Sequence, residues 1–223
     1  DYIKLFVKDE PHSRKKVTEG RFRLIHCLSL VDQVIDRILM GPWVGSEVRQ
    51  PMQTTQKSGW SPFPAGFQRL MTEFPLNESL AVDKSLWDWT MPGWVILAYV
   101  LMKMHQMVTD EDFPEDRYWR LVWARLFYTL GPGARFKTPL GFVWRQLYWG
   151  LMKSGSLFTL SLNSAAQLAE HVLAWIRLFP GEEIPFMWAM GDDKLLKASL
   201  TDEEMKNYWK ELERTGCKVK KME

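Results

Sequence analysis

Alternating apolar and polar residues predict short strands near both ends of the chain. Residues 2–8 alternate in polarity, and a second apolar run begins at Leu24. A period of two is typical of a strand with one covered face. Further short runs predict strands at residues 80–82, 142–144 and 147–149, and a basic strand or tail at residues 217–222.

Apolar residues that recur every three or four positions predict helices between these strands. We expect helices at residues 28–40, 66–74, 92–108, 114–130, 157–178 and 201–215. Gly41-Pro42 should end the first helix, and Pro92 should open the third as its first residue. A capping box begins at Thr201, and Gly216 should close the last helix. Residues 43–66 have no clear period and predict irregular structure.

A Gly-Asp-Asp sequence, Gly191-Asp192-Asp193, lies between two short apolar runs. Two strand-like runs separated by a glycine turn predict a tight β-hairpin over residues 184–196. The turn brings two carboxylates into one small volume, where each raises the pKa of the other unless a cation neutralises them. Mg²⁺ is the natural cation for such oxygen ligands. A plain surface turn is the alternative, because Gly and Asp are common turn residues.

Two other segments carry candidate site residues. Asp83 ends a short apolar strand, and Asp88 follows five positions later. Arg21 and Arg23 are two apart, so on an extended chain they point to the same side, where guanidinium groups suit triphosphate oxygens. Lys16 is a third notable cation in that segment. Taken alone, these residues also fit ordinary turns and an exposed basic loop.

A glycine turn at Ser154-Gly155 precedes the helix at 157–178. Thr159 and Asn163 are four apart on this helix and therefore share a face. They lie near its N-terminal end, where a helix tends to meet a ligand. Capping and solvent contact are the alternative explanation.

The composition indicates a folded chain with a substantial core. The 223 residues are 46% hydrophobic and 13% aromatic, which excludes a disordered protein. The longest apolar run, Trp94–Met102, is too short to span a bilayer, and no signal peptide is expected at the N-terminus. Cys27 and Cys217 are far apart without metal-ligand spacing, which favours two free thiols in a reducing compartment.

The net charge of +2 is unevenly distributed. Residues 4–23 carry seven basic and three acidic side chains, and residues 214–223 carry four basic and one acidic. The segment between them is mildly acidic. Two basic ends around an acidic middle suit an anionic substrate near carboxylate-bound cations.

Five separated pieces resemble, in order, the motifs of viral RNA-dependent RNA polymerases. Lys8-Asp9-Glu10 through Arg21-Phe22-Arg23-Leu24-Ile25 resembles motif F, Asp83-x4-Asp88 resembles motif A, Ser154-Gly155-x3-Thr159-x3-Asn163-Ser164 resembles motif B, and Gly191-Asp192-Asp193 resembles motif C. The helix from Thr201 and the basic strand after Gly216 are similar to motif D. The Asp-Lys-Ser-x-Trp-Asp-Trp sequence of motif A most resembles the sobemovirus and luteovirus-like polymerases of positive-strand RNA viruses.

The resemblance covers nearly the whole chain and implies an α+β fold. It implies a right-hand polymerase palm, with an antiparallel sheet backed by helices, plus partial fingers. Residues 1–78 would be partial fingers, and residues 79–223 the palm core with a fingers insertion at about 110–145. Nothing in the sequence matches an upstream index finger, motif E or a thumb, so we expect these parts to be absent from this chain.

The implied activity is template-directed nucleotidyl transfer from NTPs to an RNA 3′-hydroxyl, with two Mg²⁺ ions and Mn²⁺ as a possible substitute. By resemblance, Asp83, Asp192 and Asp193 are catalytic metal ligands. A motif D lysine would protonate pyrophosphate, with Lys220 the first choice and Lys218 and Lys221 competing. The implied substrate-binding residues are Lys8, Lys16, Arg21, Arg23, Asp88, Ser154, Gly155, Thr159 and Asn163, with Asp88 and Asn163 on the ribose 2′-hydroxyl and Ser154-Gly155 in a flexible loop beside the template.

The implied partners are an RNA template, a primer or product strand, NTPs and other viral replication proteins. The implied location is the host cytoplasm, at membrane-associated replication complexes. Two alternatives remain. A reverse transcriptase shares the palm carboxylates, although its ribose gate is usually a bulky aromatic residue where Asp88 stands. A catalytically silent palm that binds RNA is the other alternative.

Overall fold

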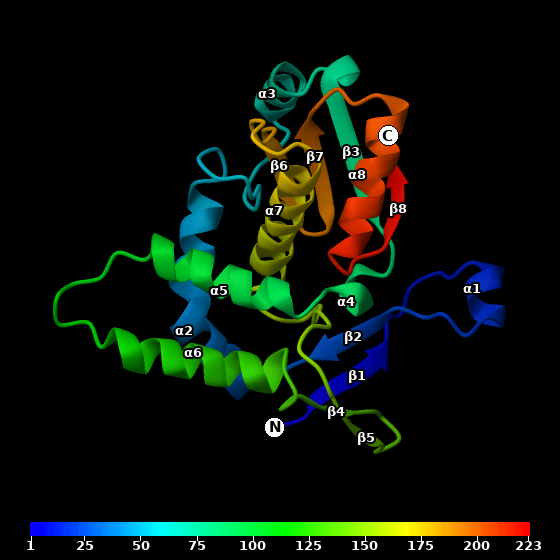
Figure 1. The fold of residues 1–223 in the computed structure, drawn as a ribbon. Helices are drawn as coiled ribbons and strands as arrows, with labels where there is room; N and C mark the ends of the chain where they lie inside the picture. Colours follow the sequence, from blue (N-terminus) through cyan, green and yellow to red (C-terminus); the bar gives the residue numbers. More distant parts are fainter.

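The computed structural model describes residues 1–223 and has an α+β fold with two four-stranded sheets (Figure 1). The central sheet has the strand order β6-β7-β3-β8, and all of its neighbouring strands are antiparallel. Its strands are β3 (Ser79–Lys84), β6 (Met187–Met190), β7 (Asp193–Lys197) and β8 (Val219–Met222). Helices α7 (Thr159–Leu178) and α8 (Asp202–Arg214) cover one face of this sheet (Figure 1).

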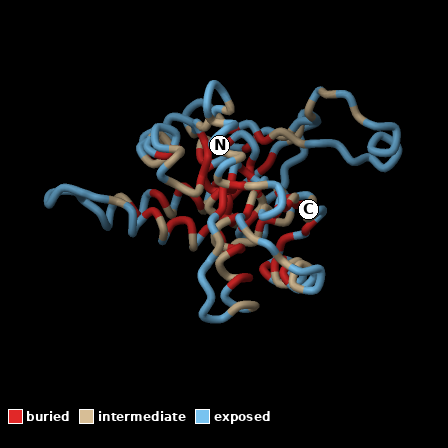
Figure 2. The backbone as a smooth tube through the Cα atoms, turned by 90° about the horizontal axis from the view of Figure 1, so that it is seen from above, coloured by how far each residue is buried: buried red, intermediate tan, exposed pale blue.

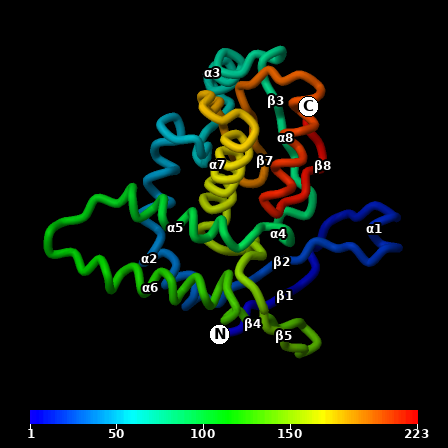
Figure 3. Tube along the Cα trace, viewed as in Figure 1, coloured from blue at the N-terminus to red at the C-terminus, as the bar shows by residue number.

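The N-terminal sheet has the order β2-β1-β4-β5 and combines segments far apart in sequence. Its strands are β1 (Ile3–Val7), β2 (Leu24–Cys27), β4 (Arg135–Lys137) and β5 (Val143–Arg145). Strand β1 pairs with β2 in antiparallel and with β4 in parallel orientation. The β1–β2 connection contains the short helix α1 (Arg14–Thr18) and projects from the molecule (Figures 1 and 3).

The remaining helices pack around these sheets. They are α2 (Leu30–Arg49), α3 (Gly66–Glu73), the 3-10 turn η1 (Leu76–Glu78), α4 (Trp87–Thr90), α5 (Trp94–Gln106) and α6 (Glu115–Thr129). Buried ion pairs bind α2 to both of its neighbours, Arg125 of α6 to Asp36 and Lys103 of α5 to Glu47. None of the helices combines the length and the hydrophobicity that a bilayer-spanning segment needs.

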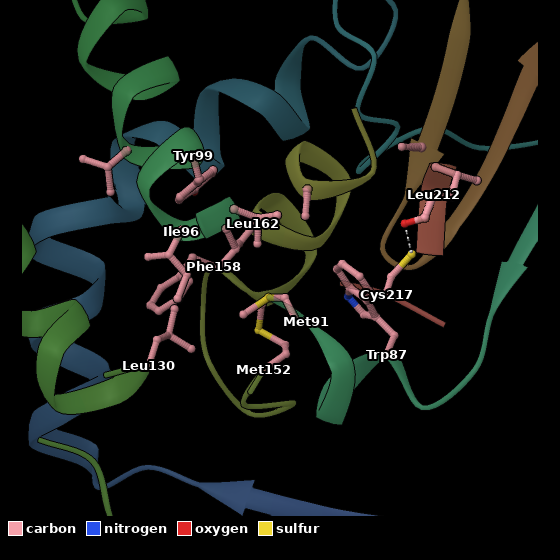
Figure 4. Packing of buried hydrophobic residues seen from close by; sticks show 14 of the residues in the cluster. Trp87, Met91, Ile96, Tyr99, Leu130, Met152, Phe158, Leu162, Leu212 and Cys217 are labelled. Atoms are coloured by element: carbon pink, nitrogen blue, oxygen red, sulfur yellow. Dashed lines mark hydrogen bonds between the residues drawn. The ribbon is translucent and has the colours of Figure 1, made fainter. Parts of the chain in front are cut away.

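One large hydrophobic cluster joins the central sheet to α5, α6, α7 and α8. Figure 4 shows part of it, where Phe158 lies beside Ile96 and Leu130, and Met91 and Met152 lie between this group and Trp87. A smaller cluster, Ile3, Leu28, Ala134 and Phe136, lies beneath the N-terminal sheet. Buried residues gather in the middle of the molecule, and the projecting loops are exposed (Figure 2).

The expected end of the first helix at Gly41-Pro42 is wrong, because α2 continues for about two further turns. Pro42 removes one backbone donor, but tertiary contacts hold the rest of the helix. The Trp43 ring packs 5.5 Å from Trp119, and Glu47 forms its buried ion pair with Lys103. These contacts lie far away in sequence, so the local stop signal could not reveal them.

Other differences concern short elements and boundaries. No strand forms at 147–149; this segment instead leads to an isolated bridge between Gly150 and Pro92. Helix α5 begins at Trp94 rather than at Pro92. Helices α1 and α4 and strand β4 were not predicted, because segments of three to five residues carry too little periodic signal. The other predicted helices and strands are confirmed, with boundary shifts of a few residues.

Candidate active site

The side chains of Asp83 and Asp193 lie on adjacent strands of the central sheet. Val82 pairs with Lys194, so Asp83 and Asp193 face each other one position further along the same register. Val82 is buried against the helices, whereas Asp83 points to the open face because side chains alternate along a strand. Directly opposed residues have Cβ atoms about 5 Å apart, and like charges there are destabilising. A cation bound between the two carboxylates would relieve this repulsion.

Asp192 reaches the same place through the tight turn between β6 and β7. Met190 and Asp193 close the hairpin, which leaves Gly191-Asp192 as a two-residue loop. Gly191 has φ +70°, a value suited to the first position of a type II′ turn. The Ser164 hydroxyl of α7 accepts a hydrogen bond from the Gly191 N–H at 3.0 Å. The helix therefore holds the turn in place.

The acidic side chains influence one another electrostatically. Burial raises the pKa of Asp193, and the neighbouring Asp192 and Asp83 raise it further. Burial also raises the pKa of Asp88, Asp192 adds to the effect, and Arg23 opposes it. Asp83, Asp192, Asp193 and Asp88 thus form one acidic site, as expected for carboxylates that share cations.

Lys220 is the cation that contacts this site. Its Nζ lies 2.5 Å from Asp83 Oδ2, and this hydrogen bond and the Asp83 charge raise the Lys220 pKa. Lys84 pairs with Val219 and Asp83 with Lys221, so Lys220 is the extra residue of a β-bulge. The bulge turns the Lys220 side chain to the open face. The Lys221 ammonium group forms a salt bridge with Glu223 rather than with Asp83.

The donor chemistry of the site fits Mg²⁺, which prefers carboxylate oxygens. However, no three acidic, His or Cys side chains are grouped at metal-binding positions in this structure. One oxygen of Asp83 is held by Lys220.

Asn163 is oriented by a buried tryptophan. Trp87 Nε1, which can only donate, bonds the Asn163 Oδ1 at 2.9 Å. The amide nitrogen is therefore the part of Asn163 left to donate to a ligand. Trp87 immediately precedes Asp88 in α4. The same helical turn therefore carries the Asp88 carboxylate, which can accept a hydrogen bond, and the Trp87 indole, which orients the Asn163 amide donor.

The predicted flexible loop at Ser154-Gly155 is packed against the N-terminal sheet. A Cβ added at Gly155 would lie only 2.0 Å from the His26 carbonyl oxygen of β2. The His26 ring also contacts the Ser154 hydroxyl at 3.5 Å. Thr159 donates to the Lys153 and Ser156 carbonyls, so its hydroxyl closes this loop.

Gly155→Ala should therefore destabilise the chain by roughly 1–3 kcal/mol, because the backbone of either the loop or β2 must move. Urea unfolding of the two proteins measures this difference. Gly45→Ala is the matched control, because a methyl group at this position inside α2 would lie 3.8 Å from its nearest neighbour, a guanidinium nitrogen of Arg49. This change should stabilise the chain by up to about 1 kcal/mol. Equal effects of the two changes would contradict the close contact at Gly155.

The predicted phosphate-binding cations do not converge in one place. Lys8 and Arg23 both lie near Glu10, at 2.7 and 3.7 Å. Arg21 pairs with Glu19 instead, so the two arginines do not share a partner. Lys16 is exposed on the projecting helix α1. Among these cations, Arg23 influences the acidic site, because its positive charge lowers the pKa of Asp88.

Comparisons with known proteins identify similar sequences among viral polymerases. A family model described as viral RNA-directed RNA-polymerase matches residues 1–60. The replicase polyprotein P2AB of Cocksfoot mottle virus is 35% identical over 202 residues, and that of Southern bean mosaic virus is 31% identical over the same length. Both alignments cover 87% of this chain. The RNA-directed RNA polymerase of Mushroom bacilliform virus is 28% identical over 86% of the chain.

The chain belongs to the viral RNA-directed RNA polymerase family. It spans about a fifth of the length of the two replicase polyproteins (20% and 19%) and 46% of the Mushroom bacilliform virus polymerase. The family and the enzyme class predicted from the five motifs are confirmed. The relationship to sobemovirus replicases is confirmed as well.

Buried polar residues behind the acidic site were not predicted. Lys84 and Lys194 each follow a site aspartate, and alternation along β3 and β7 turns both toward the helices. Lys84 forms a fully buried ion pair with Glu170 of α7. Lys194 donates to the Tyr208 hydroxyl at 3.2 Å, and burial lowers its pKa to about 7. The alternation was the signal that could have identified them.

A cavity of about 600 Å³ lies on the open face of the central sheet beside the acidic site. Asp83, Asp193 and Lys221 line one part of it, and Lys57, Trp60 and Trp188 line another. The acidic site therefore opens into a space large enough for part of a substrate.

Proposed function

We propose that the chain carries the nucleotidyl-transfer site of a viral RNA-directed RNA polymerase, which adds NTPs to an RNA 3′-hydroxyl under the direction of an RNA template. The observation that carries this proposal is the register that sets Asp83 opposite Asp193, with Asp192 in the adjoining turn. In this family we assign residues 79–223 to the palm, with a fingers insertion at about 110–145, and residues 1–78 to partial fingers. Replication would take place in the host cytoplasm, at membrane-associated complexes with other viral replication proteins.

Asp83, Asp192 and Asp193 would hold two Mg²⁺ ions. When bound, these ions supply activation of the attacking hydroxyl and neutralise charge on the phosphates. The carboxylates fix the position of the reacting groups, and Ser164 fixes the turn that carries Asp192 through its bond to the Gly191 N–H.

Lys220 would deliver a proton to the pyrophosphate leaving group. Its contact with Asp83 keeps it protonated and within the site, because the pKa of this lysine is raised. Rotation of the exposed Lys220 side chain away from Asp83 would bring its ammonium group to the phosphates. Lys8 and Arg23, together with Lys16 and Arg21 on the projecting loop, would meet the triphosphate as it enters.

Asp88 and Asn163 would recognise the ribose 2′-hydroxyl. The Asn163 amide nitrogen can donate because Trp87 occupies the oxygen, and the Asp88 carboxylate can accept. A site built to hydrogen-bond a hydroxyl discriminates against the analogue that lacks it, because its polar groups are then left unpaired.

Asn163→Ala or Asp88→Ala should therefore narrow the preference for NTP over dNTP, by up to roughly 10⁴-fold if the whole discrimination rests on this site. Single-turnover incorporation by the complete replicase, with matched ribo- and deoxynucleotides, measures the ratio. Asn207→Ala, an exposed asparagine on α8, is the control and should leave the ratio unchanged. An unchanged ratio in both site variants would remove these residues from ribose recognition.

The proposed activity itself is tested by Mg²⁺-dependent incorporation of labelled NTPs on a primed RNA template by the complete replicase. Incorporation on RNA with NTPs supports the proposal. Preferential incorporation of dNTPs would favour a reverse transcriptase, and RNA binding without any incorporation would favour a silent RNA-binding module.

A further inference from the structure

The outer face of the N-terminal sheet carries an unusual row of side chains. On β1 and its flanks, Tyr2, Lys4, Phe6 and Lys8 are two positions apart and therefore share one face, opposite the buried Ile3. Tyr2 and Phe6 are 43% and 44% exposed, so their rings are accessible on this face. Aromatic and cationic groups thus alternate along one exposed strand.

The strand register adds more cations to this face. Lys4 lies opposite Lys137 on β4, and Arg135 lies opposite Arg145 on β5. Lys137 also lies 5.9 Å from the centre of the Tyr2 ring, which confirms that the two share a side. We call Lys4, Arg135, Lys137 and Arg145 the cationic face.

Two pairs of like charges in direct opposition destabilise a sheet. All four side chains of the cationic face are exposed, and none of them forms a salt bridge. The Arg145 guanidinium donates to the Pro132 carbonyl, which fixes its position without neutralising its charge. The cost of this arrangement is offset if an anion binds there.

The sequence around β4 and β5 contains no neutralising residue. Between Asp116 and Glu170 there is no Asp or Glu, although the segment includes seven Lys or Arg residues. Two of these seven, Arg125 and Lys153, are buried and engaged inside the molecule. The others remain available to a polyanion.

From these observations we propose that the cationic face, with Phe6 and Tyr2, binds single-stranded RNA outside the acidic site. The cations contact successive phosphates, and the exposed aromatic rings stack with bases, the combination by which sheet surfaces bind single strands. This inference rests on the proposed function, which supplies RNA as the polymer.

The position of this face suits such a role. At its far end, Lys8 and Arg23 form the next pair after Val7 and Leu24 in the β1–β2 register. The positive charge of Arg23 lowers the pKa of Asp88 in the acidic site. The opposite face of β2 contacts the Ser154-Gly155 loop through His26. RNA on the cationic face would therefore lead toward the acidic site while remaining clear of its carboxylates.

The experiment measures binding of a fluorescent oligouridylate to the chain by anisotropy across a series of salt concentrations. Lys4→Ala/Lys137→Ala should weaken binding about 20-fold near 0.1 M salt and lower the slope of log K against log[salt] by about 1.4, because each lost phosphate contact on a single strand contributes about 0.7. Phe6→Ala should weaken binding roughly fivefold or more without changing the slope.

The control is Lys206→Ala/Lys210→Ala, which removes two exposed lysines without salt bridges from α8 and should leave binding unchanged. Equal binding by the two double variants would overturn the proposal. Stronger binding of the wild-type chain to anionic phospholipid vesicles than to RNA, lost in Lys4→Ala/Lys137→Ala, would also overturn it by identifying a membrane as the partner.

Two further readouts separate this proposal from its alternatives. Thermal unfolding of Lys4→Ala/Lys137→Ala should show an unchanged or higher midpoint, because the change removes repulsion; a large fall would mean that the lysines serve the fold. Asp192→Asn should bind the oligouridylate normally. If the complete replicase fails to incorporate NTPs while the double variant still loses RNA binding, the proposed function fails and the cationic face stands.

Discussion

Asp83→Asn and Asp192→Asn in the complete replicase are each expected to abolish nucleotide addition, by at least about 10³-fold, and to leave RNA affinity nearly unchanged. Each change removes a charge that would hold a catalytic cation, and such cations contribute several kcal/mol to the transition state. RNA affinity comes mainly from basic side chains, which neither change touches.

Primer extension with Mg²⁺ as the sole divalent cation, beside anisotropy with a labelled RNA, measures both quantities. Asp202→Asn is the matched control, because it removes an exposed aspartate from the first turn of α8. It should retain normal extension. Incorporation above about a tenth of the wild-type rate in either site variant would exclude that aspartate as an essential metal ligand.

The largest stability effect is expected at the buried ion pair behind the acidic site. Lys84→Met should destabilise the chain by about 3–5 kcal/mol, because it leaves the fully buried Glu170 carboxylate without its cation. Thr215 donates to Glu170 at 3.1 Å, but one neutral donor does not replace a charge. Urea unfolding followed by circular dichroism measures the change.

The double variant Lys84→Met/Glu170→Leu should recover most of this loss, because an apolar pair of similar volume avoids the buried charge. Arg69→Met, which breaks the exposed pair with Glu73 on α3, should cost no more than about 0.5 kcal/mol. If the double variant were no more stable than Lys84→Met, the loss would come from packing rather than from the unpaired carboxylate.

Local sequence signals were sufficient for much of the central sheet and its helices. The hairpin around Gly191, the capping box at Thr201 and the C-terminal Gly216 were all predicted, because each depends on residues within a few positions of one another. The family could also be predicted, because its motifs occur in a fixed order along the chain.

The first helix shows where local signals fail. Gly41-Pro42 is a strong stop in isolation, yet α2 passes through it because Trp43 and Glu47 bind partners more than fifty residues away. Similarly, the local sequence predicts only a glycine turn at Ser154-Gly155, and its packing against β2 depends on a distant segment. In both cases a long-range contact outweighs the preference of the local segment.

Within the site, the choice among the three C-terminal lysines also depends on long-range strand pairing and not on local sequence. Sequence alone left Lys218, Lys220 and Lys221 as competitors, because nothing local says which side chain faces an aspartate. The β-bulge between β3 and β8 directs Lys220 to Asp83. A one-residue change of register reverses the direction of a side chain, and register depends on the pairing of distant strands.

By itself, the sequence determined the family and most of the order of the elements, and it predicted the candidate carboxylates, because these reside in short motifs and in the period of apolar residues. Only the tertiary structure decided which strands pair, so it alone set Asp83 opposite Asp193, buried Lys84 against Glu170, and aligned Lys4 with Lys137 and Arg135 with Arg145. The physical reason is that cross-strand partners are chosen by long-range packing and hydrogen bonding, which local periodicity does not encode.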